Sequence, residues 1–364
     1  MAKILCITNS SELAGTEKVV LLGLKALKAR GHKAHLLSLH PLGALAPLLR
    51  AESISCQGLA YGRPFGLGDL GAILRAARAW EPDAIWQVGH NVAAAWAIRS
   101  LCPGHRVLSC HFHHEPPAWR WRLIYGQAVR TYDCVTFVNA FARDQALLLA
   151  PVLGDHSLVL NNPYELPKLL TRSERLRSRR AMALPPDARV VGNAGQLIHR
   201  KRWDVFLRVL KLLQRKRPTW AVIAGDGPQA AELKAMARHG GLTDKIRWLG
   251  QRSDMRTVYA SMDVLLFNSD VDVLGNTPIE AVTLGLPAVC SVERGGLAGF
   301  FGAVKGLEVL GSHDEEALAA RCERFLKYTR QSGECIRNLR HIIRRDCAPS
   351  RFAANLENLL GLAG

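Results

Sequence analysis

Short apolar runs alternate with longer amphipathic stretches along the whole chain. Lys3–Thr8 has the apolar character of a buried strand, and Thr16–Arg30 carries apolar residues at helical spacing. Gly31 predicts the end of this helix, and Ala34–Leu39 predicts a second strand. The same pattern predicts further strands at Ala84–Val88, Arg106–Cys110, Cys134–Val138 and Leu158–Leu160, with helices between them such as Ala140–Leu149. This alternation is typical of βαβ units and parallel sheets.

The alternation breaks near the middle of the chain and then restarts. Asn161-Asn162-Pro163 has turn chemistry, Lys168–Arg180 is a charged, helix-compatible segment, and Pro185-Pro186-Asp187 ends it. Strands are then expected at Arg189–Ala194, Trp220–Ala224, Ile246–Leu249, Val264–Phe267 and Ala288–Ser291. Helices are expected at Trp203–Arg215, Pro228–Arg238, Asp254–Ser261, Pro278–Leu284, Glu315–Thr329 and Arg351–Leu360.

The pattern therefore predicts two successive doubly wound α/β domains, the second beginning after the break. We expect a first domain at 1–163, a linker at 164–187 and a second domain at 188–345. Residues 346–364 are expected to form a C-terminal helix that packs back towards the first domain. Ligands bind such sheets at the carboxyl ends of their strands, so we expect the active site in a cleft between two facing edges.

Length and composition agree with this organisation and exclude several classes of protein. A chain of 364 residues suits two domains, and 48% hydrophobic with 22% charged residues excludes a disordered, collagen-like or coiled-coil protein. Apolar runs fall short of the roughly 18–20 residues that span a bilayer, and Ile4–Ile7 is too short for a signal-peptide core. We therefore expect a cytoplasmic protein. The 9 Cys are scattered without a CxxC motif, which argues against disulfides and a cysteine zinc site.

The net charge of +17 is concentrated in one segment. Between Lys168 and Arg217 there are 15 Lys or Arg but only three acids, Glu174, Asp187 and Asp204. Such a patch suits a phosphate-bearing partner, whether nucleic acid, anionic lipid or a nucleotide. A solvated basic surface that keeps the protein soluble is the plainer interpretation.

Two strand-to-helix junctions of the second half carry candidate phosphate chemistry. Gly225-Asp226-Gly227-Pro228 indicates a tight turn and is weak evidence alone. In Asn276-Thr277-Pro278-Ile279-Glu280, Thr277 and Glu280 have the spacing of a capping box. The same geometry would offer helix amides to a phosphate and a carboxylate to ribose hydroxyls, and spacing does not separate the two interpretations.

Basic and histidine side chains follow two other predicted strands. Lys201, with Arg200 and Arg202 beside it, lies where a strand end meets a helix start, and a lysine there can neutralise a diphosphate. A flanking basic loop is the alternative. His111 and His113 follow the strand Arg106–Cys110; they suit a substrate contact at a strand tip better than a metal site, because the sequence shows no second set of ligands. A structural role for these histidines stays open.

Read together, these motifs resemble the retaining glycosyltransferases of the two-Rossmann-domain (GT-B) type, family four. The resemblance is most specific over about 189–291, in GNAGQLIHRKRWDVF, AVIAGDGPQAAEL and IRWLGQRSDMRTVYASMDVLLFNSDVDVLGNTPIEAVTLGLPAV. It is looser in the first half, through AGTEKVV, SCHFHH, DCVTFVNAFARDQAL and VLNNP. It implies a GT-B fold of two Rossmann-like domains facing across a cleft, with the donor in the second.

The resemblance assigns roles to polar residues of the second half. The family's paired acids fall on Asp272, near the transferred sugar, and Glu280, at the ribose; Asp272 stands where the family usually has Glu. The family's basic pair at the diphosphate falls on Gln196 and Lys201, and Gln196 replaces the usual Arg. We expect Arg200 or Arg202 to supply the missing charge.

Backbone and cleft positions are implied in the same way. Asn276 and Thr277 match a backbone phosphate cradle, and Gly15 matches the first loop near the donor phosphate. The segment from Leu249 to Arg252 matches the strand end near the base. His111 best matches the cleft histidine, with His113 as the alternative.

The activity implied by the resemblance is transfer of a sugar from a nucleotide diphosphate sugar, with retention, to a hydroxyl of a glycan or lipid-linked acceptor. UDP-sugars are favoured over GDP-sugars, and cell-surface polysaccharide or lipopolysaccharide is the expected product. No cofactor or metal is expected, because Lys201 and helix amides would stabilise the leaving diphosphate. Asp270-Val271-Asp272 reads as D-x-D but lies at the sugar-acid position of the pattern.

Three alternatives stay open at the level of sequence. One is a sugar-nucleotide epimerase of the same fold, and another is an inactive relative, suggested by the departures at Gln196 and Asp272. The third is a nucleic-acid-binding protein that uses the 168–217 patch; nucleic acid is not the expected partner, because the patch lacks interleaved aromatic residues.

The basic charge suggests an anionic membrane surface as a further partner, at the inner face of the plasma membrane. Trp119 and Trp121 alternate with Arg120 and Arg122, and such a string suits a lipid headgroup region. A half-buried helix start is the alternative interpretation of this string.

Overall fold

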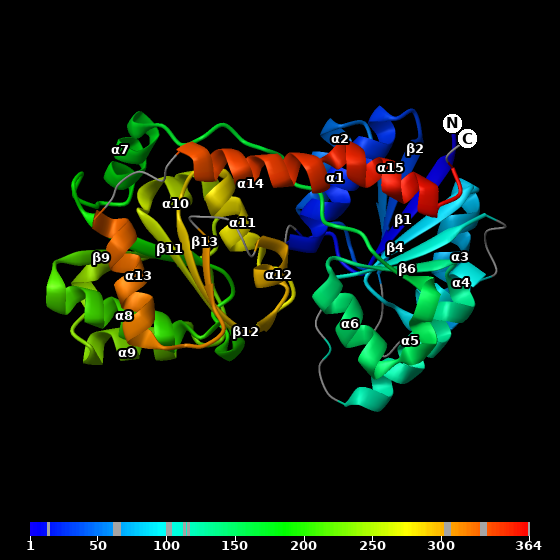
Figure 1. The fold of residues 1–364 in the computed structure, drawn as a ribbon. Helices are drawn as coiled ribbons and strands as arrows, with labels where there is room; N and C mark the ends of the chain where they lie inside the picture. Colours follow the sequence, from blue (N-terminus) through cyan, green and yellow to red (C-terminus); the bar gives the residue numbers. More distant parts are fainter. Residues whose placement is uncertain are drawn as a thin grey trace. The chain divides into compact units, whose positions relative to one another are not determined.

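The computed structural model describes residues 1–12, 15–60, 67–99, 104–111, 114, 117–301, 307–327 and 333–362. The chain divides into two compact units (Figure 1). The first unit comprises Met1–Glu165 with Ile343–Gly364, and the second comprises Leu166–Ile342. Each unit is a parallel sheet covered by helices, so the expected fold class of two Rossmann-like α/β domains is confirmed.

The first unit contains a seven-stranded sheet of order β3-β2-β1-β4-β5-β6-β7. Its strands are β1 Lys3–Thr8, β2 Lys33–Ser38, β3 Ser55–Gly58, β4 Ala84–Val88, β5 Arg106–Cys110, β6 Cys134–Phe137 and β7 Ser157–Val159. Ile4 pairs with Ala34 on one side and with Ala84 on the other, which places β1 in the middle of the sheet. Continuous apolar runs such as β4 are buried because helices cover both faces of a parallel sheet.

The helices of the first unit fill the connections between these strands. They are α1 Gly15–Ala29, α2 Leu45–Ala51, α3 Leu67–Trp80, α4 Val92–Arg99, α5 Ala118–Thr131, α6 Ala140–Leu149 and the short 3₁₀ helix η1 Pro151–His156. α6 begins where predicted, because the side chain of Asn139 accepts a hydrogen bond from the amide of Ala142 (2.9 Å).

The C-terminal helix α15 (Pro349–Leu359) packs against α1 within the first unit. The Phe352 ring lies 5.7 Å from the ring of Trp86, and both belong to the core. The carboxylate of Glu357 accepts hydrogen bonds from Arg30 (2.6 Å) and pairs with His32 (2.8 Å). Apolar packing in the core and the contacts of Glu357 thus hold α15 on the first unit.

The second unit contains a six-stranded sheet of order β10-β9-β8-β11-β12-β13. Its strands are β8 Arg189–Ala194, β9 Thr219–Ala224, β10 Ile246–Trp248, β11 Val264–Asp272, β12 Ala288–Gly295 and β13 Leu307–Leu310. Its helices are α7 Arg172–Ala181, η2 His199–Lys201, α8 Trp203–Lys216, α9 Ala230–His239, η3 Thr243–Lys245, α10 Met255–Ser261, α11 Asn276–Thr283, α12 Leu297–Phe301 and α13 Glu315–Lys327. The division between the units falls within α14 (Gly333–Asp346).

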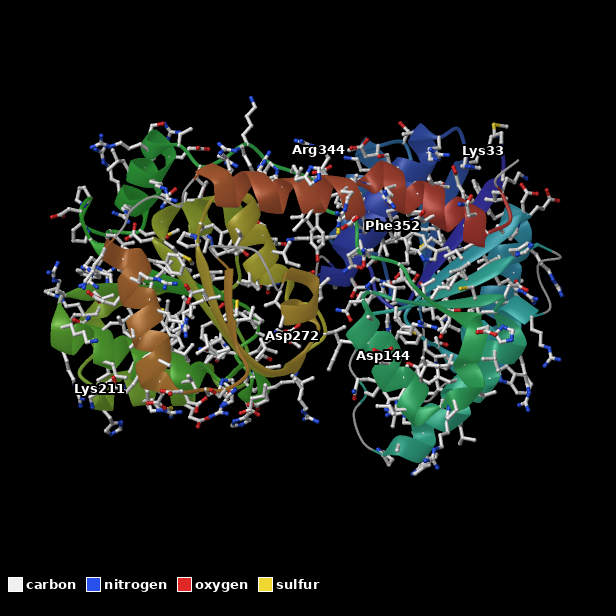
Figure 2. The ribbon with its side chains drawn as sticks, viewed as in Figure 1. Lys33, Asp144, Lys211, Asp272, Arg344 and Phe352 are labelled. Atoms are coloured by element: carbon white, nitrogen blue, oxygen red, sulfur yellow. The ribbon has the colours of Figure 1, made fainter. Side chains whose placement is uncertain are left out.

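Helix α8 shows why the sequence pattern predicted the elements of this unit. Val205, Phe206, Val209, Leu210 and Leu213 recur at helical spacing and are all fully buried. They belong to one core cluster with residues of β8, β9 and β11. The exposed face of the same helix carries its charged residues, including Lys211 (Figure 2).

The segment expected as a linker is built into the second unit. Thr171 and Glu174 form a capping box that starts α7. Arg179 of α7 donates to the carboxylate of Asp263 (2.6 Å) and to the carbonyl of Pro186 (2.7 Å). These contacts tie α7 to the residue that precedes β11 and to Pro186, and residues 166–187 belong to the second unit.

Candidate active site

Strand order reverses beside β8, where β9 lies on one side and β11 on the other. β8 and β11 pair in parallel, so Ala194 at the end of β8 and Asp272 at the end of β11 lie at the same edge of the sheet. In open α/β sheets this switch point is where ligands bind. The residues that the sequence nominated for the donor follow these strands or their neighbours.

Lys201 and Asp272 form an ion pair at this edge. The ammonium of Lys201 donates to Oδ2 of Asp272 and lies 4.7 Å from the centre of the Phe267 ring. Only 17% of the lysine side chain and 14% of the aspartate side chain are exposed, so water screens this pair weakly. The second carboxylate oxygen, Oδ1, accepts from the amide of Gly275 (2.8 Å). The lysine expected at the diphosphate and the aspartate expected at the sugar are therefore in direct contact.

The glycines of the neighbouring turn permit a close approach of two loops. Gly225 has a φ of +137°, and a Cβ added there would lie 1.9 Å from the carbonyl oxygen of Gly195. No other residue fits at this position. The GDGP sequence thus brings the turn after β9 against the turn after β8, close to Gln196.

The expected capping box at Thr277 and Glu280 is wrong. Helix α11 begins at Asn276, with Gly275 as its N-cap in a left-handed conformation (φ 72°). The hydroxyl of Thr277 donates instead to the carbonyl of Ala194 (3.2 Å), and Tyr259 donates to Glu280 (2.8 Å). Gly275 can adopt positive φ without strain, so the helix begins earlier than the side-chain pattern predicts. The carboxylate of Glu280 therefore does not cap the helix and is held instead by the hydroxyl of the buried Tyr259.

The two arginines expected to compensate for Gln196 are engaged elsewhere in the structure. Arg200 donates to the carbonyl of Val271 (2.9 Å). Arg202 donates to Asp270 (3.0 Å) and Asp204 (3.2 Å), and hydrogen bonds to these carboxylates raise its pKa further above the usual value. Gln196 itself is exposed, and its backbone carbonyl accepts from the indole of Trp203 (2.8 Å).

Leu249 and Arg252 lie farther along the same edge. Leu249 directly follows β10, and its amide donates to the carbonyl of Ile223 (2.9 Å). Gly225 donates to the carbonyl of Gly250 (2.7 Å), which links this turn to the switch point. Arg252 is exposed on the following segment.

The remaining nominated residues belong to the first unit. Gly15 is the first residue of α1. His111 follows β5 and is partly buried, and this desolvation lowers the pKa of its imidazole to about 4. Its alternative, His113, lies outside the described residues.

Sequence reasoning missed His90, which follows the neighbouring strand β4. Its Nε2 is buried and has no hydrogen-bond partner among the described residues. Burial lowers the pKa of this imidazole to about 4, although a side-chain hydrogen bond to Gln127 acts in the opposite direction. In the sequence, the only indication was a single histidine after an apolar run. Because β4 pairs in parallel with β5, His90 and His111 follow neighbouring strands at the same edge of the first sheet.

A set of residues that could hold a metal ion lies at the edge of the second sheet. Oxygens of Asp270 and Glu293 lie 3.2 Å and 3.8 Å from Nε2 of His313, and Nδ1 of His313 lies 2.6 Å from the hydroxyl of Ser291. The same oxygen of Asp270 accepts from Arg202, so an arginine already provides positive charge there. These residues are distant in sequence, and only the sheet brings them together.

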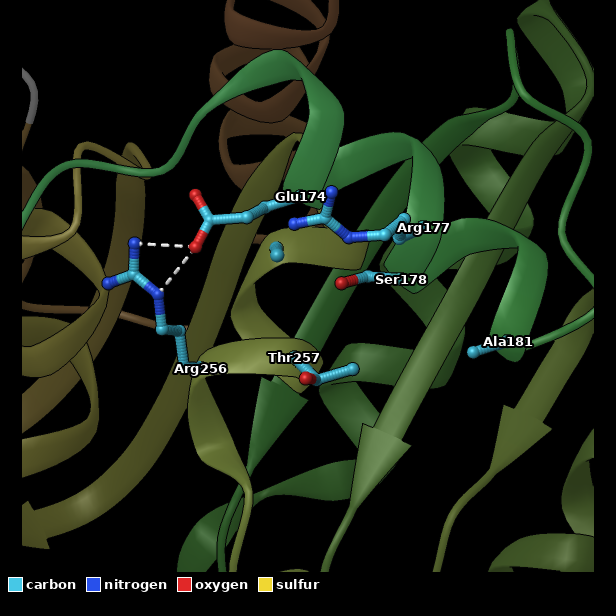
Figure 3. A pocket seen from close by; sticks show the side chains of 7 residues that line it. Glu174, Arg177, Ser178, Ala181, Arg256 and Thr257 are labelled. Atoms are coloured by element: carbon cyan, nitrogen blue, oxygen red, sulfur yellow. Dashed lines mark hydrogen bonds and ion pairs between the residues drawn. The ribbon is translucent and has the colours of Figure 1, made fainter.

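A separate cavity of about 320 Å³ lies between α7 and α10 (Figure 3). It is lined by Glu174, Arg177, Ser178, Ala181, Arg256, Thr257 and Ala260. Arg256 pairs with Glu174 (2.8 Å), and hydrogen bonds from Arg256 and Thr171 lower the pKa of Glu174 to about 2. None of the nominated donor residues lines this cavity.

Comparison with known proteins decides the family. The model for "Glycosyl transferases group 1" matches residues 174–342, and the model for "Glycosyltransferase Family 4" matches residues 13–166. Together they cover most of the chain. The chain belongs to the family-four glycosyltransferases of the GT-B fold.

Curated relatives of this glycosyltransferase match over part of their length. The lipopolysaccharide core biosynthesis mannosyltransferase LpsB of Rhizobium meliloti is 31% identical over 124 residues, which are 32% of this chain and 35% of that protein. The 2-deoxystreptamine glucosyltransferase of Streptomyces kanamyceticus is 33% identical over 135 residues, 36% of this chain and 34% of that protein. The matched part therefore spans about a third of these relatives.

Solved structures show the same fold over the whole glycosyltransferase. Anabaena HepE in complex with UDP and glucose has a TM-score of 0.84 and 18% identity, with both chains covered at 100%. WaaG, described as a glycosyltransferase involved in lipopolysaccharide biosynthesis, has a TM-score of 0.74 and 14% identity, and 99% of this chain and 100% of that chain are covered. No helix in the described part of the glycosyltransferase is both long and apolar enough to cross a membrane.

Proposed function

We propose that this glycosyltransferase binds a nucleotide diphosphate sugar at the switch point of the second sheet and transfers the sugar with retention. The observation that carries the proposal is the convergence of Lys201, Asp272 and the start of α11 at one strand edge. A cation, an acid and the amides of a helix N-terminus are the groups that a diphosphate and a sugar need. The acceptor is a hydroxyl of a glycan or of a lipid-linked glycan.

Different residues bind the diphosphate, the ribose, the base and the sugar of the donor. Lys201 neutralises the diphosphate, and the backbone at Asn276 and Thr277 donates to the phosphate oxygens. Glu280, held by Tyr259, accepts from the ribose hydroxyls, and Leu249 and Arg252 lie beside the base. Asp272 accepts from a hydroxyl of the sugar once the diphosphate has replaced it as the partner of Lys201.

Transfer exchanges one bond at the anomeric carbon for another on the same face. The bond from this carbon to the diphosphate oxygen breaks, and a bond to the acceptor oxygen forms. The acceptor proton moves to the departing phosphate oxygen, so the step balances without an enzyme nucleophile or a required metal ion. In the first unit, the family resemblance assigns a sugar contact to His111, whose imidazole burial keeps neutral, and an approach to the donor phosphate to the backbone of Gly15.

UDP-sugars are the favoured donors, because HepE, which has the same fold, is described in complex with UDP and with UDP-glucose. A glycan acceptor of the lipopolysaccharide type is supported by the names of two relatives, LpsB and WaaG. Nucleic acid is not proposed, because much of the basic segment 168–217 is engaged internally. The engaged side chains are Arg175, Arg179, Arg189, Arg200, Lys201, Arg202 and Arg208.

A melting-temperature screen against UDP, GDP, ADP and their sugars tests this proposal. A ligand at about 100 times its Kd adds about 2.7 kcal/mol, which raises the melting temperature by several degrees. We expect UDP and a UDP-sugar to stabilise the protein more than the other nucleotides. Stabilisation by none of them would contradict the proposal, and conversion of the sugar without release of the diphosphate would indicate an epimerase.

A further inference from the structure

Exposed large apolar side chains gather in one part of the first unit. Among the described residues, eight of the twelve such side chains lie between Val92 and Val159, and the other four are scattered. Those in helices are Val92 and Trp96 of α4, Trp119 and Leu123 of α5, Leu148 of α6 and Val152 of η1. Their exposed fractions run from 52% to 76%, so the folded unit leaves them uncovered.

These helices are neighbours on one layer of the unit. α5 packs against α4, α6 and η1, and Figure 1 shows α5 and α6 side by side. The guanidinium of Arg122 donates to the carbonyl of Leu149 (3.3 Å), which ties α5 to the end of α6. We call the six side chains listed above the outer apolar face.

Each of the two leading helices carries an apolar stripe that ends in an arginine. Val92 and Trp96 are four residues apart, and Arg99 continues the same stripe of α4. Trp119 and Leu123 are likewise four apart, and Arg130 lies seven residues after Leu123. Neither helix contains an Asp or Glu. The outer apolar face is therefore edged by positive charge alone on these helices.

The string of alternating Trp and Arg does not form the surface by itself. Trp121 is 9% exposed and packs on His114 (4.9 Å) and Tyr125 (6.1 Å), while Trp119 is 62% exposed. The half-buried interpretation thus holds for Trp121. Trp96, far away in sequence and not singled out by any motif, provides the second exposed indole.

We propose that the outer apolar face of α4, α5, α6 and η1 docks onto an anionic lipid bilayer. Indole rings favour the headgroup region, Leu and Val favour the acyl boundary, and arginines reach lipid phosphates from the ends of the stripes. α4 and α5 contain no acid, which gives these two helices charge complementarity to an anionic bilayer, while α6 and η1 carry one exposed acid each, Asp144 and Asp155. The surface lies on the first unit and is distinct from the donor residues of the second.

Vesicle flotation of the whole protein tests the proposal and needs no substrate. The probe is phosphatidylcholine vesicles with about 30% phosphatidylglycerol, compared with pure phosphatidylcholine. We expect binding to the anionic vesicles, lowered on the order of tenfold or more by combining Trp96→Ser, Trp119→Ser and Leu123→Ser. The matched control combines Leu48→Ser, Leu169→Ser and Leu176→Ser, which removes exposed apolar side chains elsewhere and leaves flotation unchanged.

Charge and folding are tested separately. Arg99→Gln with Arg130→Gln is expected to weaken flotation several-fold at low salt, and added salt should abolish the difference. Melting temperatures of the variants identify any that fail to fold, and a nucleotide-induced shift that survives in the triple variant separates this surface from the donor site. Equal flotation of the triple variant and its control, equal binding to neutral vesicles, or retention by RNA alone would overturn the proposal.

Discussion

Lys201 and Asp272 hold each other at the point where a diphosphate sugar is proposed to bind. The pair is mostly buried, so each charge depends on the other in the ligand-free protein. A diphosphate would exchange one anionic partner of Lys201 for another, and Asp272 would be released towards the sugar. Binding of the donor and readiness of the acid are therefore coupled through one ion pair.

This exchange predicts opposite effects of Asp272→Asn on binding and on transfer. Without the carboxylate of Asp272, no ion pair competes with the diphosphate for Lys201. We therefore expect the affinity for UDP to stay equal or to rise. Sugar transfer should fall about tenfold or more, because the acid at the sugar is lost. The ligand-free melting temperature should also fall, and UDP should restore part of it. Asp144→Asn, which removes an exposed carboxylate on α6, is the control (Figure 2). A loss of UDP affinity in Asp272→Asn would contradict the exchange.

Glu280 should contribute through the ribose hydroxyls. We expect Glu280→Gln to weaken binding of UDP by about 1.5–3 kcal/mol, as for other charged hydrogen bonds. The same change should matter little for 2′,3′-dideoxy-UDP, which lacks both ribose hydroxyls. Tyr259→Phe removes the hydroxyl that holds Glu280 and should show a smaller loss of the same kind. Calorimetric titration of both nucleotides into the parent and the two variants measures these affinities, and equal losses with both nucleotides would exclude the ribose contact.

Protonation of His111 should lie outside the working pH range. Because desolvation lowers its pKa from 6.5 to about 4, the unfolded chain binds the proton more readily than the folded one. The contribution of His111 to stability is thus complete above pH 6.5 and is lost as the pH falls towards 4. NMR of the labelled histidine rings, with His111→Asn for assignment, should show this ring neutral at pH 6. Titration near its ordinary value would contradict the buried environment.

The attachment of α15 should be sensitive to acid. Although burial opposes it, hydrogen bonds from Arg30 and His32 hold the pKa of Glu357 below its ordinary 4.5. Such a carboxyl stabilises the fold above pH 4.5 and loses this contribution as the pH falls through its lowered pKa. We expect Glu357→Gln to lower the melting temperature at neutral pH, since it leaves the guanidinium of Arg30 without its carboxylate partner. Melting curves should show the variant and the parent converging in acid, and a constant difference would be inconsistent with this origin.

The sequence pattern predicted the fold well where strands are apolar and buried. β8, β9 and α8 were expected almost to the residue, because their apolar positions follow one period each. β3 (sequence SCQG) was not expected, since it is short and only partly buried. β11 extends beyond Phe267 through polar residues that pair with β12, and no periodicity shows this.

The candidate site could be predicted as a set of motifs but not as contacts. The order of the motifs led to Lys201, Asp272 and Glu280, all of which lie at or next to one edge of the sheet. The pairing of Lys201 with Asp272 and the engagement of Arg202 by Asp270 depend on the register of strands distant in sequence. Residues such as His90 and His313 carry no local pattern, so only the sheets bring them to a site.

The most direct test of the account is calorimetric titration of UDP into the parent protein, Lys201→Ala and Lys211→Ala. Both variants remove one lysine charge from the second unit, but Lys211 lies exposed on α8, away from the strand edge. We predict one UDP site per chain, with affinity lowered about 10–100-fold in Lys201→Ala and unchanged in Lys211→Ala. Equal affinities in the two variants, or no binding of UDP to the parent protein, would contradict the proposed donor site.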